Sequence, residues 1–347
     1  MNNINIGIVG LGANTRLRHV PGLRACQYVT LHGVCNRTPE STSAVAAEFK
    51  IPKRYDNWQA LVHDNEIDAV VIGTWPYLHR DITVAALDAG KHVLCEARMS
   101  RDLAEAHQMN AAFQRNHQLI AQIVPSPFGL QIHQTVLRML KAGHLGELRD
   151  IIVLGTNSST ARAETEMHWR QDLNLNGLNK LAMGILHETL VRWTPDPTDV
   201  FATARTFTKQ RFDPNLGRST DVRSPDSLNI LTTLPNGASA TYHLNSATYH
   251  GPAPQIQLYG SQGTLHCLFG PEDKLLAANA TDSVLQPIAI PPEEQGDWRV
   301  EEEFINAIRG KERVQFTDFS TGVRYMAFAQ AVETSIVTAQ PCKVILD

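Results

Sequence analysis

The chain has 347 residues, of which 43% are apolar and 19% are charged, and this balance is typical of a folded globular protein with two domains. With a formal net charge of −4, the chain lacks the excess of basic residues that is typical of proteins that bind nucleic acid or an anionic membrane surface. No apolar run reaches the length of a membrane span, so we expect neither a nucleic-acid partner nor a membrane partner.

The five cysteines are scattered along the chain and are never spaced as Cys-x-x-Cys, which favours reduced thiols. The first residues enter a strand pattern without the basic and apolar regions of a secretory signal. Both features predict a cytoplasmic protein. The run His187-Glu188-Thr189-Leu190-Val191 lacks the second histidine of a zinc protease helix, and no Cys/His cluster has ligand spacing, so no metal is expected.

Strand and helix signals alternate through the first third of the chain. Apolar runs of strand length lie at 4–9, 29–35, 69–73, 92–95 and 119–123. Helical patterns lie between them, beginning near residue 15 and covering 42–49, 58–63, 82–89 and 103–116. Apolar strands that alternate with helices predict an α/β domain built on a doubly wound parallel sheet.

The pattern changes at Pro125-Ser126-Pro127. Beyond this point we expect a helix over 129–142 and a hairpin of strands 229–234 and 238–244, joined by an Asn236-Gly237 turn. Further strands are expected at 255–260 and 263–267, and helices at 301–309 and 321–339. The sequence thus predicts an N-terminal domain over residues 1–124 and an α+β domain with an open, largely antiparallel sheet over residues 125–347.

A glycine turn joins the first strand to the first helix within residues 7–12. Gly10 and Gly12 allow the tight turn and the close backbone approach that a pyrophosphate requires, and the N-terminus of the following helix favours its negative charge. The third glycine of the usual dinucleotide fingerprint is replaced by Thr15. We predict that a nicotinamide dinucleotide binds at this turn, with Leu11, Asn14 and Thr15 beside it.

The second strand ends at Asn36-Arg37-Thr38, where an acidic side chain normally binds the adenosine ribose. An arginine and a hydroxyl group, with no carboxylate to repel it, favour a 2′-phosphate at this position. The cofactor is therefore predicted to be NADP or NAD, with NADP slightly favoured. The alternative is that Arg37 is a solvated cation of the loop.

Several later runs, taken in order, resemble one enzyme family over nearly the whole chain. They are Thr74-Trp75-Pro76-Tyr77-Leu78-His79, residues 89–96, Trp169-Arg170 with Gly177 and His187, residues 236–238, residues 259–264 and residues 303–308. Together with the glycine turn they resemble the Gfo/Idh/MocA family of nicotinamide-dependent sugar and polyol dehydrogenases. The resemblance implies a Rossmann domain, followed by a domain whose open sheet lines the substrate cleft and commonly forms an oligomer interface. A homodimer or homotetramer is therefore expected.

The resemblance also implies hydride transfer between nicotinamide C4 and a carbon of a small carbohydrate-like or polyol substrate. It implies a set of residues around the cofactor, namely Thr74, Trp75, Pro76, His79, Glu96, Ala97 and Arg98. It implies substrate contacts at Trp169, Arg170 and Met183.

Two positions depart from the family at the reacting end. The family reads Glu-Lys-Pro where this chain has Glu96-Ala97-Arg98, so the lysine that helps to bind and protonate the reacting hydroxyl is absent. The family's aspartate, four residues before a histidine, is Met183 here, whereas the histidine is kept as His187. We take His187 as the leading candidate for proton transfer and Lys180, two helical turns away, as a second. The alternatives are a hydrogen-bonded core histidine and a structural lysine.

Three functions follow from these observations. The first is an NAD(P)-dependent oxidoreductase that transfers hydride to or from a carbohydrate-like or polyol substrate. The second is a cofactor-assisted lyase or glycoside-cleaving enzyme without net redox, which the loss of the lysine and the aspartate would fit. The third is a nucleotide-binding sensor without turnover. We take the first as the working hypothesis.

Overall fold

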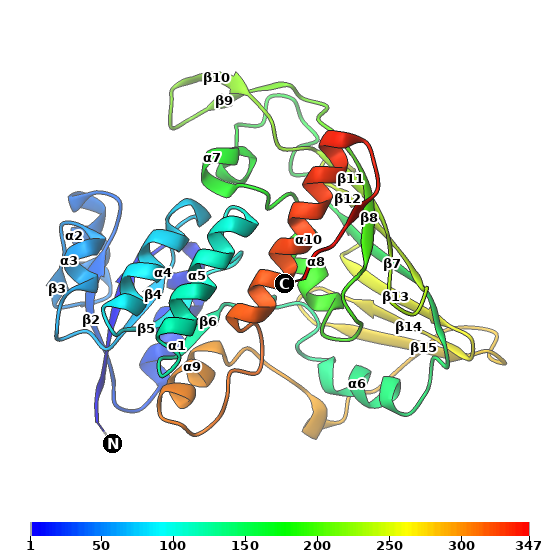
Figure 1. The fold of residues 1–347 in the computed structure, drawn as a ribbon, viewed down its shortest axis with the longest axis horizontal. Coiled ribbons are helices and arrows are strands. Elements are labelled where there is room, and N and C mark those ends of the chain that lie inside the picture. Colours follow the sequence, from blue (N-terminus) through cyan, green and yellow to red (C-terminus); the bar gives the residue numbers. More distant parts are fainter. Residues whose placement is uncertain (1, 347) are drawn as a thin grey trace. The chain divides into compact units, whose positions relative to one another are not determined.

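The computed structural model describes residues 2–346 and divides the chain into two compact units (Figure 1). The first unit contains the residues up to Pro125 together with Arg299–Met326, and the second contains Ser126–Trp298 together with the residues from Ala327 onward. The sequence places one boundary after residue 124 and assigns everything beyond it to the second domain. The contacts instead return Arg299–Met326 to the first unit, because side chains of this segment complete its core.

The first unit is built on a six-stranded parallel sheet with the strand order β3-β2-β1-β4-β5-β6. Its strands are β1 (Ile4–Val9), β2 (Val29–Cys35), β3 (Lys53–Arg54), β4 (Ala69–Ile72), β5 (His92–Cys95) and β6 (Ala121–Ile123). β1 pairs with both β2 and β4, so the order reverses at β1 and leaves a crevice at the carboxyl ends of these strands. The predicted doubly wound parallel sheet is confirmed.

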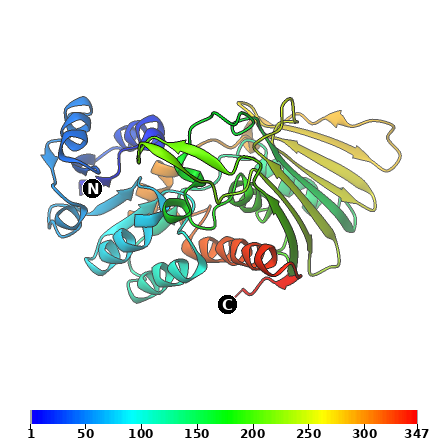
Figure 2. The same cartoon turned by 90° about the horizontal axis from the view of Figure 1, so that it is seen from above.

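Helices cover both faces of this sheet, with α1 on one face and α4 and α5 on the other (Figure 2). They are α1 (Val20–Ala25), α2 (Pro39–Glu48), α3 (Trp58–Val62), α4 (His79–Asp88), α5 (Leu103–Arg115) and α9 (Val300–Ile308). A π-helical turn, Thr15–His19, runs directly into α1. Side chains of Thr38, Asn57 and Asp102 cap α2, α3 and α5, which is why these helices begin where they do.

The segment that returns to the first unit contributes buried aromatic side chains. Phe319 is fully buried, and its ring centre lies 5.7 Å from that of Phe113 on α5. The hydroxyl of Tyr325 accepts a hydrogen bond from the backbone N–H of Met99 at 2.5 Å. The core formed by residues up to 125 is therefore incomplete without a segment that follows about 170 residues later in the chain.

The second unit is built on a nine-stranded sheet with the order β16-β15-β14-β13-β7-β12-β11-β8-β17, in which β7 and β12 are parallel and the other pairs are antiparallel. The strands are β7 (Leu148–Thr156), β8 (Asp199–Arg205), β11 (Ser227–Thr233), β12 (Ser239–Asn245), β13 (Gln255–Gly260), β14 (Gly263–Leu268), β15 (Lys274–Asn279), β16 (Gln286–Pro287) and β17 (Cys342–Lys343). The predicted open, largely antiparallel sheet is confirmed, including the hairpin at Asn236-Gly237, where Gly237 has a φ of 85°.

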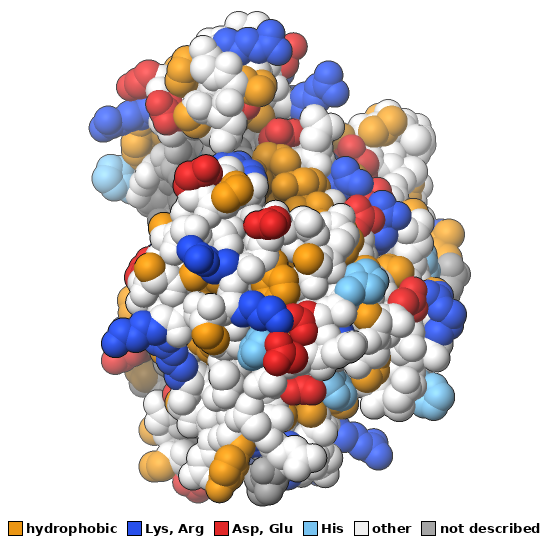
Figure 3. Space-filling view, turned by 90° about the vertical axis from the view of Figure 1, so that its left-hand side faces the viewer, with side chains coloured by type: hydrophobic (Ala, Val, Ile, Leu, Met, Phe, Trp, Pro, Cys, Tyr) orange, Lys and Arg blue, Asp and Glu red, His pale blue; other side chains and the backbone are white. Residues whose placement is uncertain are grey.

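One face of this sheet packs against helices α6 (His133–Lys141) and α8 (Met183–Leu190) and the later turns of α10 (Phe319–Thr338). The short elements α7 (Leu173–Asn176) and the hairpin β9 (Gln210–Asp213) with β10 (Arg218–Asp221) belong to the same unit. Among residues 2–346, no helix combines the length and the apolar composition needed to cross a bilayer. Basic and acidic side chains are intermingled on the face drawn in Figure 3.

Candidate active site

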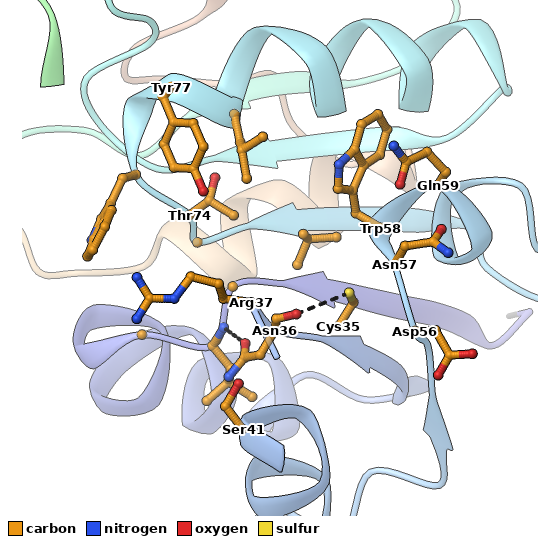
Figure 4. Close-up of a pocket in the computed structure, with 17 residues that line it drawn as sticks. Cys35, Asn36, Arg37, Ser41, Asp56, Asn57, Trp58, Gln59, Thr74 and Tyr77 are labelled. Atoms are coloured by element: carbon orange, nitrogen blue, oxygen red, sulfur yellow. Dashed lines mark hydrogen bonds between the residues drawn. The ribbon is translucent and has the colours of Figure 1, made fainter. Parts of the chain in front are cut away.

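A cavity of about 540 Å³ lies at the carboxyl ends of β1, β2 and β4 in the first unit (Figure 4). This position is the crevice where the strand order reverses, and open α/β sheets bind their ligands there. Its lining comes from four segments of the chain and consists of Val9, Gly10, Leu11, Gly12, Cys35, Asn36, Arg37, Ser41, Asp56, Asn57, Trp58, Gln59, Gly73, Thr74, Trp75, Tyr77 and Leu78.

The glycine turn is shaped by close contact with the loop after β4. Gly10 has a φ of 84°, and a Cβ atom there would lie 2.7 Å from the backbone nitrogen of Thr74. A Cβ atom on Gly73 would lie 2.2 Å from the carbonyl oxygen of Gly10 and 2.3 Å from the hydroxyl of Thr15. Thr15 therefore packs against a glycine of the neighbouring loop, which explains how the third fingerprint glycine can be replaced. Both glycines keep the turn narrow, as the backbone approach to a pyrophosphate requires.

Asn36 and Arg37 both line the cavity, but their side chains have different partners. The Asn36 Oδ1 atom accepts a hydrogen bond from the backbone N–H of Leu11 at 2.7 Å, so this side chain holds the glycine turn. The Arg37 guanidinium carbon lies 5.5 Å from the ring centre of Trp75, within the range of a cation–π contact. Arg37 thus stands beside the indole at one wall of the cavity.

The sequence suggests Thr38 as the hydroxyl group of the cofactor site, but in the structure Ser41 lines the cavity instead. Thr38 caps α2, because its hydroxyl accepts a hydrogen bond from the backbone N–H of Ser41 at 3.2 Å, and it does not belong to the cavity lining described above. Ser41 does line the cavity, on the side of Asn36 and Arg37 (Figure 4). Sequence reasoning missed Ser41, although its place in the first turn of the helix after β2 is a usable signal.

His79 is the first residue of α4 and is fully buried. Its ring nitrogens lie 3.0 Å from the carbonyl oxygen of Thr74 and 3.0 Å from that of Arg98. Burial lowers the pKa of His79, so the ring favours its neutral form. The contacts show a side chain that ties the loop after β4 to the loop after β5.

The triplet after β5 lies in the first unit, and each of its side chains has a different environment. Glu96 Oε1 accepts a hydrogen bond from the Asn14 side chain at 2.5 Å and lies 3.0 Å from Nε2 of His19. Ala97 is half-buried against the core of the unit, and the Ala97–Arg98 peptide bond is cis. The Arg98 guanidinium carbon lies 5.9 Å from the ring centre of Tyr325.

His187 lies on α8 in the second unit and is fully buried. A 2.8 Å hydrogen bond joins its Nδ1 atom to the hydroxyl of Tyr242, and its ring stacks on Phe328 with centres 3.6 Å apart. Burial raises the pKa of the Tyr242 hydroxyl, so this group stays protonated. Met183, one turn earlier on α8, is also buried and belongs to the apolar core.

Lys180 precedes α8 and is buried, with its Nζ atom 2.6 Å from a carboxylate oxygen of Glu333 on α10. Trp169 and Arg170 form a second pair, in which the guanidinium carbon lies 4.3 Å from the ring centre. Arg170 is exposed and Trp169 is half-buried. The structure therefore places Lys180 in an ion pair, and Trp169 and Arg170 at the surface of their unit.

One cluster with metal-ligand chemistry occurs among residues 2–346, formed by His32, Asp64 and Glu66 in the first unit. The ammonium group of Lys53 bonds both Asp64 and Glu66, at 2.8 Å from the latter. A cation is thus already supplied by the chain at this cluster.

The sequence matches family models in both units. Residues 4–123 match an oxidoreductase family with an NAD-binding Rossmann fold, and residues 133–266 match the Gfo/Idh/MocA C-terminal domain. The chain belongs to the Gfo/Idh/MocA family. The predictions of the family and of an NAD(P)-dependent oxidoreductase are confirmed at this level.

Individual relatives are distant. The chain is 26% identical over 270 residues to an uncharacterized oxidoreductase of Synechocystis, an alignment that covers 76% of this chain and 71% of that protein. It is 34% identical over 106 residues to a 1,5-anhydro-D-fructose reductase of Ensifer adhaerens, covering 30% of this chain and 32% of that one. A levoglucosan dehydrogenase has the same fold, with a TM-score of 0.88 at 19% identity and full coverage of both chains.

At the two positions that depart from the Gfo/Idh/MocA pattern, the side chain is apolar and contacts a hydrophobic core. Ala97 contacts the core of the first unit, and Met183 lies in the core of the second. Neither side chain can accept or donate a proton. The protein keeps the nucleotide scaffold of its family but not its usual lysine and aspartate.

Proposed function

We propose that the protein oxidises or reduces a small carbohydrate-like or polyol substrate, with NADP or NAD as the hydride carrier. The observation that carries the proposal is the cavity at the carboxyl ends of β1, β2 and β4, with the narrow glycine turn at its floor. The names of the distant relatives, a 1,5-anhydro-D-fructose reductase and a levoglucosan dehydrogenase, support a sugar-like substrate.

We propose that NADP is slightly preferred over NAD as the cofactor. Arg37 and Ser41 line it at the end of β2, where the adenosine ribose of a dinucleotide lies in this fold. A guanidinium and a hydroxyl suit a 2′-phosphate, whereas the side chain nearest the glycine turn, Asn36, is neutral and occupied by Leu11. Trp75, in contact with Arg37, adds an aromatic surface beside the same subsite.

The nicotinamide, when bound, supplies the acceptor or the donor of the hydride. The chain must then hold the substrate and move the hydroxyl proton. We propose that His187, whose ring is oriented by the hydrogen bond between Nδ1 and the Tyr242 hydroxyl, moves this proton. Lys180, in its ion pair with Glu333, is the second candidate, and Arg98 can orient a polar group but cannot act as a base because guanidinium stays protonated.

A panel experiment tests the proposal. The purified protein is assayed for bound nucleotide, and oxidation of NADPH and NADH is followed with sugars, keto-sugars and inososes. Turnover with a member of the panel supports the proposal. Product formed over tightly bound cofactor, with no net change in NAD(P)H, would instead show a lyase or glycoside-cleaving reaction, and binding of nucleotide without any product would show a sensor.

His187 is tested within the same assay. The His187→Ala variant is expected to lose about 100-fold in turnover if the ring transfers the proton. His144→Ala is the matched control in the second unit, because the His144 ring lies near the Thr264 carbonyl and on no proposed site. Equal turnover in the two variants would remove His187 from the mechanism.

The second unit also supports a homodimer or homotetramer. The sheet face opposite the helices carries a cross-strand row of side chains formed by Phe201, Leu231, Thr241, Ile152, Gln257, His266 and Leu276. Leu231 is 55% exposed and the others are half-buried. We propose that a second copy of the chain covers this row, because exposed apolar side chains on an open sheet, here Leu231 and the neighbouring Phe201, favour association. The free thiols of all five cysteines support the proposed cytoplasmic location.

A further inference from the structure

A buried charged cluster lies next to the glycine turn and is formed by three distant parts of the chain. His19 ends the π-helical turn and is fully buried. Its Nδ1 atom lies 2.5 Å from Oε1 of Glu301 on α9, and its Nε2 atom lies 3.0 Å from Oε1 of Glu96 after β5. One imidazole thus bridges two carboxylates, and we call these three residues the His19 cluster.

The His19 cluster holds its imidazole as a cation. Burial by itself would lower the pKa of His19, but the hydrogen bonds to Glu301 and Glu96 outweigh it and raise the pKa to about 9. The same contacts hold the pKa of Glu96 below its usual range, although burial opposes ionisation. Glu301 lies in the first turn of α9, where the helix dipole favours a carboxylate.

The Glu301 carboxylate lies close to a glycine of α1, Gly22. A Cβ atom on Gly22 would lie 2.6 Å from Oε2 of Glu301. The chain therefore leaves room in α1 for this carboxylate, which indicates that its position is a packed feature of the unit rather than a surface contact.

The third member of the cluster connects it to the nucleotide site. Glu96 follows β5, which neighbours β4, and the loop after β4 lines the cavity. Its Oε1 atom also accepts the hydrogen bond from Asn14, two residues beyond the last glycine of the turn. A dinucleotide that places its adenosine at β2 and its pyrophosphate at the glycine turn extends its nicotinamide half toward β4 and β5. Glu96 therefore lies on the nicotinamide side.

We propose that His19 is a positioning residue of the nucleotide site: its positive charge, secured by Glu301, holds the Glu96 carboxylate and, through Asn14, the first helical turn after the glycine loop. The inference rests on the proposed nucleotide site but not on the identity of the substrate. It predicts that nucleotide affinity depends on the charge of a side chain that does not touch the nucleotide.

The sign of the pH dependence follows from the raised pKa. The cation is present in the folded protein below about pH 9, and above that pH a neutral ring separates two carboxylates that repel each other. Titratable groups contact the ring from two elements, namely Glu96 after β5 and Glu301 on α9. Affinity for the nucleotide is therefore expected to be constant at neutral pH and to fall as the pH rises through about 9.

The test measures nucleotide binding rather than turnover. Dissociation constants for NADPH and NADH are measured by fluorescence titration from about pH 7 to about pH 10 for the wild type, His19→Gln, Glu301→Gln and Gly22→Ala. His63→Gln is the matched control, since this exposed histidine bonds the Gln59 carbonyl in the same unit. The charge of His19 is read directly from the imidazole nitrogen shifts of the ¹⁵N-labelled protein, and thermal unfolding checks that each variant folds.

The wild type and His63→Gln are expected to lose about 10-fold in affinity across this pH range, whereas His19→Gln is weakened by a similar factor at neutral pH and shows a flat profile. Glu301→Gln and Gly22→Ala are expected to move the loss of affinity and the ¹⁵N titration of His19 to lower pH. These two variants keep the test decisive if His19→Gln does not fold.

The inference is overturned if folded variants of the His19 cluster bind nucleotide with the same affinity and pH profile as the wild type, or if the nitrogen shifts show a neutral His19 at neutral pH. A wild-type protein that binds no nucleotide at all would overturn the proposed function as well, so the two failures are distinguishable.

Discussion

Arg37 is the side chain on which the choice between NADP and NAD depends. It lines the cavity at the end of β2 and stands beside Trp75. Replacing it in Arg37→Ser removes a charged donor, so the dissociation constant of NADPH is expected to rise about 10- to 100-fold. That of NADH should change by less than about 3-fold. Fluorescence titration with both cofactors measures the difference.

The control for this variant is Arg54→Ser, because Arg54 is an exposed arginine of the same unit that donates a hydrogen bond to the Ser43 hydroxyl at 3.4 Å. Equal losses of affinity for NADPH and NADH in Arg37→Ser would show that the guanidinium shapes the loop rather than binding a 2′-phosphate.

Substitutions at two glycines of the nucleotide site are expected to have different effects, one mainly on stability and the other mainly on nucleotide affinity. In Gly73→Ala the new Cβ atom would meet the Gly10 carbonyl oxygen at 2.2 Å, and we expect a loss of about 1–3 kcal/mol in the free energy of unfolding. In Gly12→Ala the nearest neighbour is 3.6 Å away, so stability should change by less than about 1 kcal/mol. The methyl group would nevertheless stand where the pyrophosphate approaches, and nucleotide affinity should fall about 10-fold or more.

Urea unfolding and nucleotide titration, carried out on both glycine variants, check this separation. A Gly12→Ala variant that binds nucleotide as tightly as the wild type would show that the pyrophosphate lies elsewhere in the cavity.

At the scale of elements, α2 supports the cofactor subsite through its first turn. Thr38 and Ser41 form a reciprocal cap, and only Ser41 belongs to the cavity lining described above. We expect Thr38→Ala to lower the free energy of unfolding by about 1 kcal/mol through loss of the cap. Affinity for NADPH should fall more in Ser41→Ala than in Thr38→Ala, as measured by titration. A larger loss of NADPH affinity in Thr38→Ala would show that Thr38 contacts the phosphate, as the sequence suggests.

At the scale of the whole molecule, the first unit needs a segment from the far end of the chain. Phe319 is fully buried in its core, and Phe319→Ala is expected to cost about 3–5 kcal/mol in unfolding free energy. A fragment that ends at residue 125 should therefore lack a cooperative thermal transition. A fragment in which the segment 299–326 is joined to it by a flexible linker should regain one, and calorimetry distinguishes the two. A cooperative transition in the shorter fragment would contradict this dependence.

The second whole-molecule prediction concerns the open face of the nine-stranded sheet. Leu231→Glu places a charge in the cross-strand row, so light scattering should show a smaller oligomer than for the wild type. Val337→Glu is the control, because Val337 is 75% exposed on α10 rather than on the sheet. An unchanged mass for Leu231→Glu would place the interface elsewhere.

Sequence patterns predicted the first unit well and the second only in part. The strands and most helices of the parallel sheet were recognised because buried parallel strands are continuous apolar runs. No strand was predicted at β7, β8 or β15, although Ile151 and Val153 show the alternation of a half-buried strand. Such alternation is weak in short, mixed sequences, and the sheet partners that stabilise these strands lie far away in the chain.

The residues of the candidate site were likewise predicted only in part. The glycine turn and Arg37 were found from local spacing, whereas Ser41 and the residues 56–59 at the far end of the cavity were not. These side chains meet the glycine turn only when β2, β3 and β4 are brought together. The burial of His187 against Tyr242 and Phe328 likewise depends on strands and helices that no local pattern connects.

The sequence by itself determined the family, the alternating α/β scaffold, the nucleotide turn and the two departures at Ala97 and Met183. Each of these features can be recognised from a short run of consecutive residues. Only the tertiary structure decided that Thr15 packs on Gly73, that residues 299–326 complete the first unit, and that His19 bridges Glu96 and Glu301. His19 and Glu301 are 282 residues apart, and such a pair forms only after the sheet and its returning segment have closed around it.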